Sequence, residues 1–258
     1  MAKIIGLTNQ KGGVGKTSSA ILLAFHLIEL GYRVLCLDSD GQGNLTSRLA
    51  RDMEGKMLPL TGTRVLDLFK PDLEAIEVMH CPRGMDLIPT KPYDLAMYEL
   101  EAIPLRQATL PAMHCKELFR QYDYVIIDCP PSLGRLLIAA LTMCSHVVVP
   151  VRVSGFSVDG IGGLLQTITT VRGTTNPGLN LVGVFVNDYN PDSREQNKSL
   201  AQLREMAGDN LMCNLIRNRP PIDTAVNKGI PLSELGYAHV AVKEVRALMN
   251  EIIEKVEA

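Results

Sequence analysis

The sequence predicts an α/β protein built on a doubly wound, mostly parallel sheet that is flanked by helices. Short apolar runs rich in β-branched residues alternate with longer helical patterns along the chain. The apolar runs contain few polar residues, as expected for strands buried on both faces of a parallel sheet. A glycine-rich loop joins the first run to a helix. In such folds ligands bind at the carboxyl ends of the strands.

The predicted elements follow one another in βα order. We expect strands at residues 4–8, 33–37, 124–127, 146–151 and 181–186. We expect helices near residues 17–30, 133–143, 157–172 and 194–207. In the last helix of the chain, apolar residues recur at helical spacing: Val245, Leu248, Met249, Ile252, Ile253 and Val256. Its polar face mixes cations with glutamates, whereas a membrane-surface helix has a cationic polar face, so we expect this helix to pack on the core.

Residues 51–122 break the regular pattern. Prolines punctuate the short elements of this region: Pro59, Pro71, Pro82, Pro89, Pro92, Pro104 and Pro111. We interpret the region as an insertion of helices and hairpin strands that packs on the same core. Because 258 residues suit one substantial core, we expect a single domain over residues 1–258.

The composition is that of a soluble globular protein. Hydrophobic residues make up 46% of the chain and the formal net charge is −2, so no overall basic excess points to nucleic acid. Six cysteines show no C-x-x-C spacing, and Cys36, Cys129 and Cys144 lie in or beside apolar runs. We expect these three to be buried small side chains. No signal peptide or membrane-spanning segment is recognisable, so we expect a cytoplasmic protein.

The most informative segment is the loop that runs from Lys11 to Thr17, with the sequence Lys-Gly-Gly-Val-Gly-Lys-Thr. Between a strand and a helix, such a loop directs backbone N–H groups and the helix dipole at an anion. Lys16 would reach the β- and γ-phosphates of a nucleotide, and the Thr17 hydroxyl would hold Mg²⁺. The ordinary phosphate-binding loop, G-x-x-x-x-G-K-[ST], has its first glycine where this chain has Gln10. We predict that the following residues bind the nucleotide phosphates: Gly12, Gly13, Val14, Gly15, Lys16, Thr17 and Ser18.

Three aspartates lie at or just beyond the ends of predicted strands. Asp128 ends an apolar run, where its carboxylate can meet the ligand shell of Mg²⁺. Asp38 also ends a run, and Asp40 lies two residues beyond it. Phosphoryl transfer needs neutralised charge, an in-line water and exclusion of bulk solvent. The Asp128 carboxylate is therefore a candidate for the ligand shell of the metal ion.

Four segments resemble the ParA members of the deviant Walker A branch of P-loop ATPases, the ParA/MinD branch. The first is the lysine-containing loop together with the preceding Asn9-Gln10. The second is residues 37–46, where Gly41 stands at a position that is usually proline, and the third is residues 124–134, which match the Walker B strand. The fourth and weaker segment runs from residue 216 to residue 231. The resemblance therefore spans the chain from about residue 3 to the last helix.

This resemblance implies an ATP hydrolase with slow intrinsic turnover that uses ATP, ADP and Mg²⁺. Thr17, Asp38 and Asp128 would lie around the metal ion, and Asp40 would position or activate the attacking water. Lys11 would cross a two-fold interface and touch the phosphates bound to the other subunit, in the role of an arginine finger. The catalytic residues implied are thus Lys11, Lys16 and Asp40.

The resemblance defines base and DNA contacts less closely. Asn187 follows a strand at a usual place for an adenine-contacting group, although it could equally cap the turn at 187–191. The segment 217–221, which contains Arg217 and Pro220, would supply further contacts to the base. Proteins of this family bind DNA without sequence preference through basic residues in the C-terminal third. The candidates here are Arg194, Lys198, Arg217 and Arg219.

The function implied is that of a ParA-type partition ATPase. It would dimerise around ATP, bind double-stranded DNA non-specifically at the nucleoid, and drive plasmid or chromosome segregation with a ParB-like partner that stimulates hydrolysis. A MinD-like or other cargo-positioning ATPase is an alternative that would use the same ATP-hydrolysing site. An iron–sulfur redox ATPase is a third possibility, but the glycine-rich surroundings expected of cluster ligands are missing around Cys129.

Overall fold

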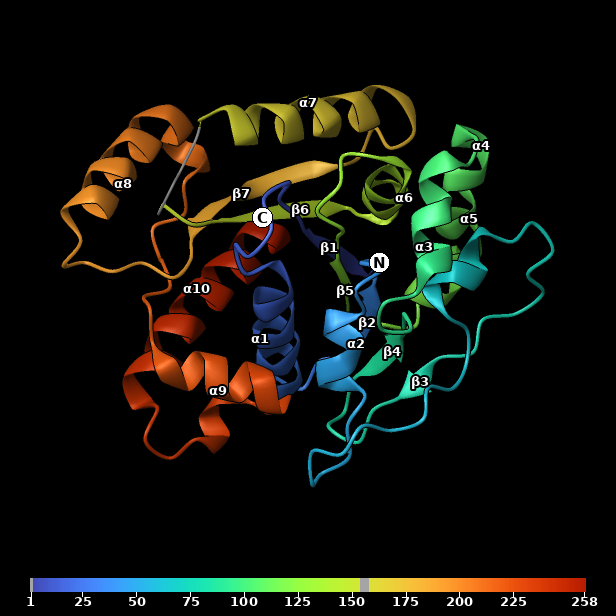
Figure 1. Cartoon of the computed structure of the whole chain (residues 1–258), viewed down its shortest axis with the longest axis horizontal. Coiled ribbons are helices and arrows are strands. Elements are labelled where there is room, and N and C mark those ends of the chain that lie inside the picture. Colours follow the sequence, from blue (N-terminus) through green and yellow to red (C-terminus); the bar gives the residue numbers. More distant parts are fainter. Residues whose placement is uncertain (1, 154–157) are drawn as a thin grey trace.

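The structure is a computed structural model that describes residues 2–153 and 158–258, and a seven-stranded sheet runs through these residues (Figure 1). The strands follow one another in space in the order β3-β4-β2-β5-β1-β6-β7. Every neighbouring pair is parallel except β3 with β4. Their bounds are β1 (Lys3–Leu7), β2 (Val34–Asp38), β3 (Met79–His80), β4 (Asp86–Ile88), β5 (Tyr124–Asp128), β6 (His146–Val151) and β7 (Asn180–Val186). The predicted α/β fold class is confirmed.

Helices cover both faces of the sheet. The α-helices are α1 (Lys16–Glu29), α2 (Asn44–Leu49), α3 (Leu95–Glu99), α4 (Leu105–Ala108), α5 (Leu110–Phe119), α6 (Arg135–Met143), α7 (Val158–Thr174), α8 (Arg194–Ala207), α9 (Pro220–Lys228) and α10 (His239–Glu257). Short 3₁₀ helices are η1 (Val65–Phe69), η2 (Leu100–Ala102), η3 (Gly208–Asn210) and η4 (Leu232–Glu234). The helices α1, α2, α9 and α10 pack on one face, and α3 to α8 pack on the other.

The apolar runs of the sequence are explained by this double cover. In β5, Tyr124 and Ile126 belong to the core on the α1 side, whereas Val125 and Ile127 belong to the core on the α6 side. Successive side chains of a strand point to opposite faces, so a strand covered twice must be apolar at every position. Full burial of each such side chain contributes about 1.5–3 kcal/mol to folding.

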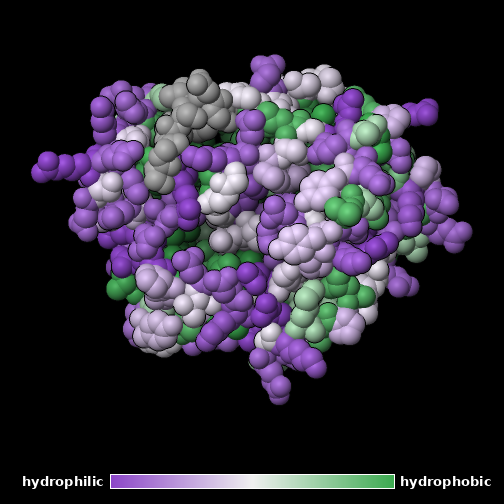
Figure 2. Space-filling model, viewed as in Figure 1, coloured by the Kyte–Doolittle hydropathy of each residue, from purple (hydrophilic) through white to green (hydrophobic). Residues whose placement is uncertain are grey.

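The last helix packs on the core, as predicted. The apolar residues of α10 that recur at helical spacing are all buried against α1 and the sheet. No helix in the described ranges is both long enough and apolar enough to cross a bilayer. The face shown in Figure 2 is mostly hydrophilic, and its hydrophobic residues form small groups rather than a continuous band.

Residues 51–122 contribute to the main sheet as well as covering it. β3 and β4 form an antiparallel hairpin, and β4 also pairs in parallel with β2. The sequence pattern predicted hairpin strands here but not that one of them joins the parallel sheet. β4 has only three residues, which is too short for a periodic signal. The helices α4 and α5 then pack beside α6, and α3 leads into η2, which also contacts α6.

The fold brings the ends of three central strands together. Asp38 at the end of β2 and Leu7 at the end of β1 are both register partners of Asp128 at the end of β5. Because these strands are parallel, the loops that follow them leave the sheet at the same edge. The glycine-rich loop, the Asp40 segment and the segment after Asp128 therefore lie side by side.

Candidate active site

Asparagine side chains hold the glycine-rich loop between β1 and α1. Asn9 donates from Nδ2 to the carbonyl of Pro150 at 2.7 Å, and its Oδ1 accepts from the backbone N–H of Lys11 at 2.9 Å. Asn187, at the end of β7, donates to the carbonyl of Val14 at 2.9 Å. Gly15 has a φ of 96°, and a Cβ there would lie 2.1 Å from Asn187 Nδ2. Only glycine allows this contact, so the loop is fixed at the N-terminus of α1.

Lys16, Thr17 and Asp128 meet below this loop. Lys16 is buried, and the Thr17 hydroxyl donates to Asp128 Oδ2 at 2.6 Å. Asp128 is fully buried, and its Oδ1 has no hydrogen-bond partner among residues 2–153 and 158–258. Burial, followed by the neighbouring Asp38 carboxylate, raises the pKa of Asp128 well above its usual range. A buried carboxylate oxygen without a partner fits a Mg²⁺ ion or its bound water.

Asp38 is engaged differently. Its Oδ2 accepts from the backbone N–H of Thr46 at 2.7 Å, and its Oδ1 accepts from the N–H of Asp40 at 3.4 Å. Burial raises the pKa of Asp38 to about 7. Both oxygens thus support the backbone of the following loop, so Asp128 is the better placed of the two for a metal ion. The described residues contain no group of three or more His, Cys, Asp or Glu side chains that could hold a metal ion, and phosphate and water oxygens are ligands that Mg²⁺ commonly takes.

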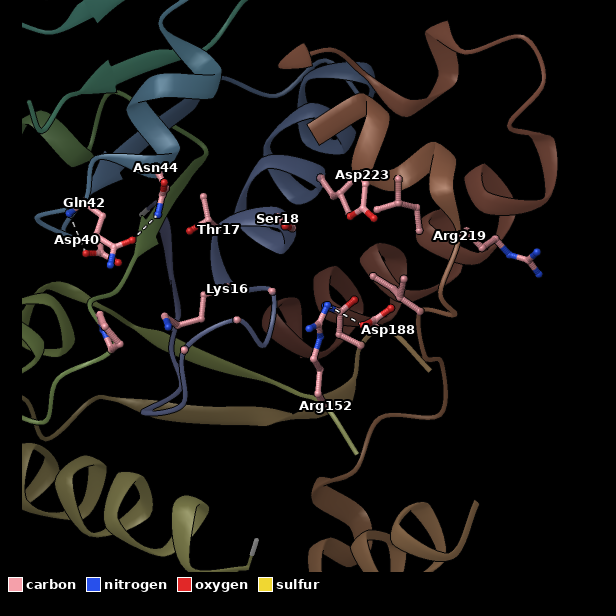
Figure 3. Close-up of a pocket in the computed structure, with 18 of the residues that line it drawn as sticks. Lys16, Thr17, Ser18, Asp40, Gln42, Asn44, Arg152, Asp188, Arg219 and Asp223 are labelled. Atoms are coloured by element: carbon pink, nitrogen blue, oxygen red, sulfur yellow. Dashed lines mark hydrogen bonds and ion pairs between the residues drawn. The ribbon is translucent and has the colours of Figure 1, made fainter. Parts of the chain in front are cut away.

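The loop after β2 supplies polar groups that border the same cavity (Figure 3). Asp40 accepts from the backbone N–H of Gln42 at 3.0 Å, and Asn44 donates to the Gln42 side chain at 3.0 Å. The cavity has a volume of about 300 Å³ and is lined by Lys16, Thr17 and Asp40 at one end. Gln42 and Asn44 were not predicted as site residues, although they lie inside the second motif of the sequence.

The far end of the cavity suits a nucleobase. Its lining includes the apolar side chains of Leu22, Ile216 and Ile222, together with Asn187 and Arg217. Ring systems favour such an apolar slot with a few polar groups. Pro220, which was predicted to contact the base, begins α9 and is not among the lining residues.

A charged pair that the sequence did not predict lies at this end. Arg152 follows β6, and its Nη2 lies 2.6 Å from a carboxylate oxygen of Asp188, which follows β7 (Figure 3). Both residues line the cavity, as does Asp223 of α9. β6 and β7 are neighbours in the sheet, which brings these two residues together.

The four residues predicted to bind DNA fall into two groups. Arg194 and Lys198 are exposed on α8. Arg219 instead makes two hydrogen bonds to Glu244 of α10, at 2.7 and 2.6 Å, and Arg217 lies 3.4 Å from the same carboxylate. The Arg219 guanidinium group points away from the phosphate loop in Figure 3. The second pair therefore fixes the segment before α9 to α10.

The cysteines are arranged as small core residues. Cys36, Cys129 and Cys144 are buried, as predicted. A hydrogen bond with Cys144, followed by burial, raises the pKa of the Cys129 thiol well above its usual range. Thiolates are the form that ligates iron, so this environment does not favour a cluster bridged between subunits.

The chain is similar to known proteins over nearly its whole length. A family model described as an AAA domain matches residues 2–181. The chromosome-partitioning ATPase Soj of Thermus thermophilus is 34% identical over 257 residues, which cover 98% of this chain and 96% of that protein. The chromosome partitioning protein ParA of Caulobacter vibrioides is 33% identical over 233 residues, which cover 89% and 86% of the two chains.

A solved structure is similar at the level of the fold and the sequence. Cobyrinic acid a,c-diamide synthase from Mycobacterium smegmatis, with bound ADP and magnesium, has a TM-score of 0.80 and 27% identity. The match covers 100% of this chain and 96% of that one. Together with the loop from Lys11 to Thr17, the Asp38 segment and the strand that ends at Asp128, these similarities show that the chain belongs to the ParA family of partition ATPases.

Proposed function

We propose that the protein binds ATP with Mg²⁺, hydrolyses it to ADP and phosphate, and couples this cycle to DNA segregation. The observation that carries the proposal is the pairing of Thr17 with Asp128 at 2.6 Å beneath the glycine loop, with the second Asp128 oxygen buried and without a partner in the described chain. Mg²⁺ bound there would neutralise charge on the β- and γ-phosphates. Lys16 and the backbone N–H groups of the loop would bind the same phosphates.

Asp40 would orient the attacking water. Its carboxylate lines the cavity beside Lys16 and is held by the backbone N–H of Gln42 at 3.0 Å. A fixed carboxylate at this place can accept a hydrogen bond from water in line with the γ-phosphate. Turnover should be slow in the protein alone, because a switch needs a long-lived ATP state.

Lys11 would act across a dimer interface. Lys11, Gly12 and Gly13 are exposed at the top of the loop. Two glycines there leave room for the backbone of a second chain to approach closely. Lys11 of each subunit would then neutralise charge that develops on the nucleotide of the other, so that ATP binding and dimerisation become one equilibrium.

DNA and a ParB-like partner would complete the cycle. The ATP-bound dimer would bind double-stranded DNA at the nucleoid, in the cytoplasm, through cations that include Arg194 and Lys198 of α8. Both are exposed, and a dimer would present twice as many of these cations to the DNA phosphates. A ParB-like protein bound to the cargo DNA would stimulate hydrolysis and release the dimer. The names of the Soj and ParA relatives support this assignment to chromosome partitioning.

Light scattering after size exclusion tests the nucleotide-dependent dimer. The parent protein should be dimeric with ATP and monomeric with ADP or without nucleotide. Lys16→Ala should not bind nucleotide, and Lys11→Ala should bind ATP but remain monomeric. Lys56→Ala, which removes an exposed lysine far from the loop in sequence, is the matched control and should dimerise. Normal ATP-dependent dimerisation of Lys11→Ala would contradict the trans role of this residue.

DNA binding should be measured with ATP, with ADP and without nucleotide across a salt series. We expect binding only with ATP, and a steep loss of affinity as the salt concentration rises. Equal DNA affinity with ATP, with ADP and without nucleotide would contradict the proposal that ATP binding controls DNA binding.

A further inference from the structure

Two loops border the γ-phosphate end of the cavity. The first, called the Asp40 loop, comprises residues 40–43, and the second, called the post-β5 loop, comprises residues 129–134. Asp40, Gln42 and Pro131 all line the cavity. Hydrolysis requires that both loops keep their positions relative to the bound nucleotide, because a displacement of about 1 Å can cost up to about 100-fold in rate.

The segment at residues 94–101 binds the Asp40 loop from outside. The backbone N–H of Asp94 donates to the carbonyl of Gly41 at 3.2 Å. A Cβ on Gly41 would lie 3.1 Å from Cβ of Met97 and 3.4 Å from Cζ of Tyr98. Met97 is fully buried, so α3 is anchored where it meets the loop. Gly41, which stands at a position that is usually proline, is therefore held by α3 instead of by a proline ring.

The same segment also binds the post-β5 loop. Glu101 accepts from the Ser132 hydroxyl at 2.6 Å through Oε1, and from the backbone N–H of Arg135 at 2.5 Å through Oε2. Both are charge-assisted hydrogen bonds, which are among the strong ones in proteins. A Cβ on Gly134 would lie 1.8 Å from Glu101 Oε2, so the carboxylate fills the space that any other residue would need.

We propose that Glu101 is a positioning residue for ATP hydrolysis. It acts through the post-β5 loop and, by way of α3, keeps that loop in a fixed position relative to the Asp40 loop. The inference rests on the proposed ATPase function. It assigns a role in hydrolysis to residues 51–122, which the sequence showed only as an irregular insertion. Glu101 does not line the cavity, so its effect is on the rate of the chemical step and not on contact with ATP.

Single-turnover hydrolysis and the binding of a non-hydrolysable ATP analogue test this role in the full chain. Glu101→Gln keeps the size of the side chain but can accept only one of the two hydrogen bonds. We expect the rate constant for hydrolysis to fall about tenfold, since the loop is misplaced rather than lost, while the dissociation constant of the analogue stays within about twofold. Glu99→Gln is the matched control, because it removes the same charge from an exposed position on α3, and it should behave like the parent.

A milder variant keeps the test decisive if Glu101→Gln folds poorly. Ser132→Ala removes one hydroxyl and leaves the bond from Glu101 to Arg135, so we expect a fall of about threefold. Combined with Glu101→Gln, it should add less than its own factor, because both changes act on the same contact between residue 101 and the post-β5 loop.

Three results would overturn the inference. The first is that Glu101→Gln and Ser132→Ala both hydrolyse ATP at the parent rate, and the second is that binding of the analogue weakens as much as hydrolysis does. The third is that the two effects on the hydrolysis rate multiply fully in the double variant. A parent protein that does not hydrolyse ATP at all would instead refute the proposed function. The two failures are therefore distinguishable.

Discussion

Replacement of Asp128 by asparagine should stabilise the nucleotide-free protein while removing its response to Mg·ATP. Asp38 and Asp128 are register partners on adjacent strands, and both are fully buried. Adjacent strands lie about 4.8 Å apart. Two ionised carboxylates at about 5 Å repel each other by about 3 kcal/mol at an effective dielectric constant of about 20. Asparagine removes this repulsion and can still accept the hydrogen bond from Thr17.

The gain should depend on pH. Burial raises the pKa of Asp38 to about 7, and burial and Asp38 together raise that of Asp128. A carboxyl group with a raised pKa in the folded state stabilises the fold while it is protonated, below its ordinary pKa of about 4, and that stability is lost as the pH rises through about 7. The penalty for a buried carboxyl with a raised pKa grows as the pH rises above about 4, so Asp128→Asn should raise the melting temperature more at pH 8 than at pH 5.

Thermal unfolding followed by circular dichroism is the assay, at pH 5 and pH 8, with and without Mg·ATP. Allowing for the hydrogen bonds that already support Asp38, we expect about 2 kcal/mol at pH 8, or about 4–8 °C for a chain of this size. Asp72→Asn removes an exposed charge and serves as the control. The reasoning is refuted if Asp128→Asn melts with the parent at pH 8, if the shift is equal at both pH values, or if the variant gains as much stability from Mg·ATP as the parent does.

Three further changes test other parts of the structure. Asp40→Ala should bind ATP and lose hydrolysis, so that light scattering finds a dimer that persists long after the parent has returned to monomer; rapid decay to monomer would be against the assigned role. Gly229→Ala should lower the free energy of unfolding by at least about 2 kcal/mol in urea titrations, because Gly229 has a φ of 65° and the new Cβ would lie 1.9 Å from the carbonyl oxygen of Arg48. Replacing Arg194 and Lys198 with alanine should weaken ATP-dependent DNA binding and reduce the slope of log affinity against log salt by about 2, and an unchanged slope would remove α8 from the DNA surface.

The parts of the site that could be predicted from the sequence are those encoded by neighbouring residues. The loop from Lys11 to Thr17 and the aspartate at the end of β5 each combine a strand pattern with a chemical group at a fixed offset. The strand pattern arises because both faces of the sheet are covered, and this places the group at the ligand-binding edge. The fold class follows from the same periodicity.

The parts that could not be predicted depend on contacts between distant residues. Arg152 and Asp188 lie 36 positions apart and meet only because β6 and β7 are neighbours in the sheet. Glu101 reaches Ser132 from a region whose short elements, broken by prolines, carry no periodic signal. The sequence shows only that Gly41 stands where proline is usual, and the packing of Met97 against it depends on a contact between residues more than 50 positions apart.

The contact between Asn187 and the glycine loop has a consequence for the choice of substrate. Because the amide nitrogen of Asn187 is turned toward the Val14 carbonyl, its oxygen is the group left to meet a ligand in the cavity. An oxygen attracts the exocyclic amine of adenine and repels the exocyclic carbonyl of guanine. The Asn187 side chain would thus both select adenine over guanine and hold the glycine-rich loop in place. A guanine nucleotide should therefore also weaken the contacts between this loop and the triphosphate.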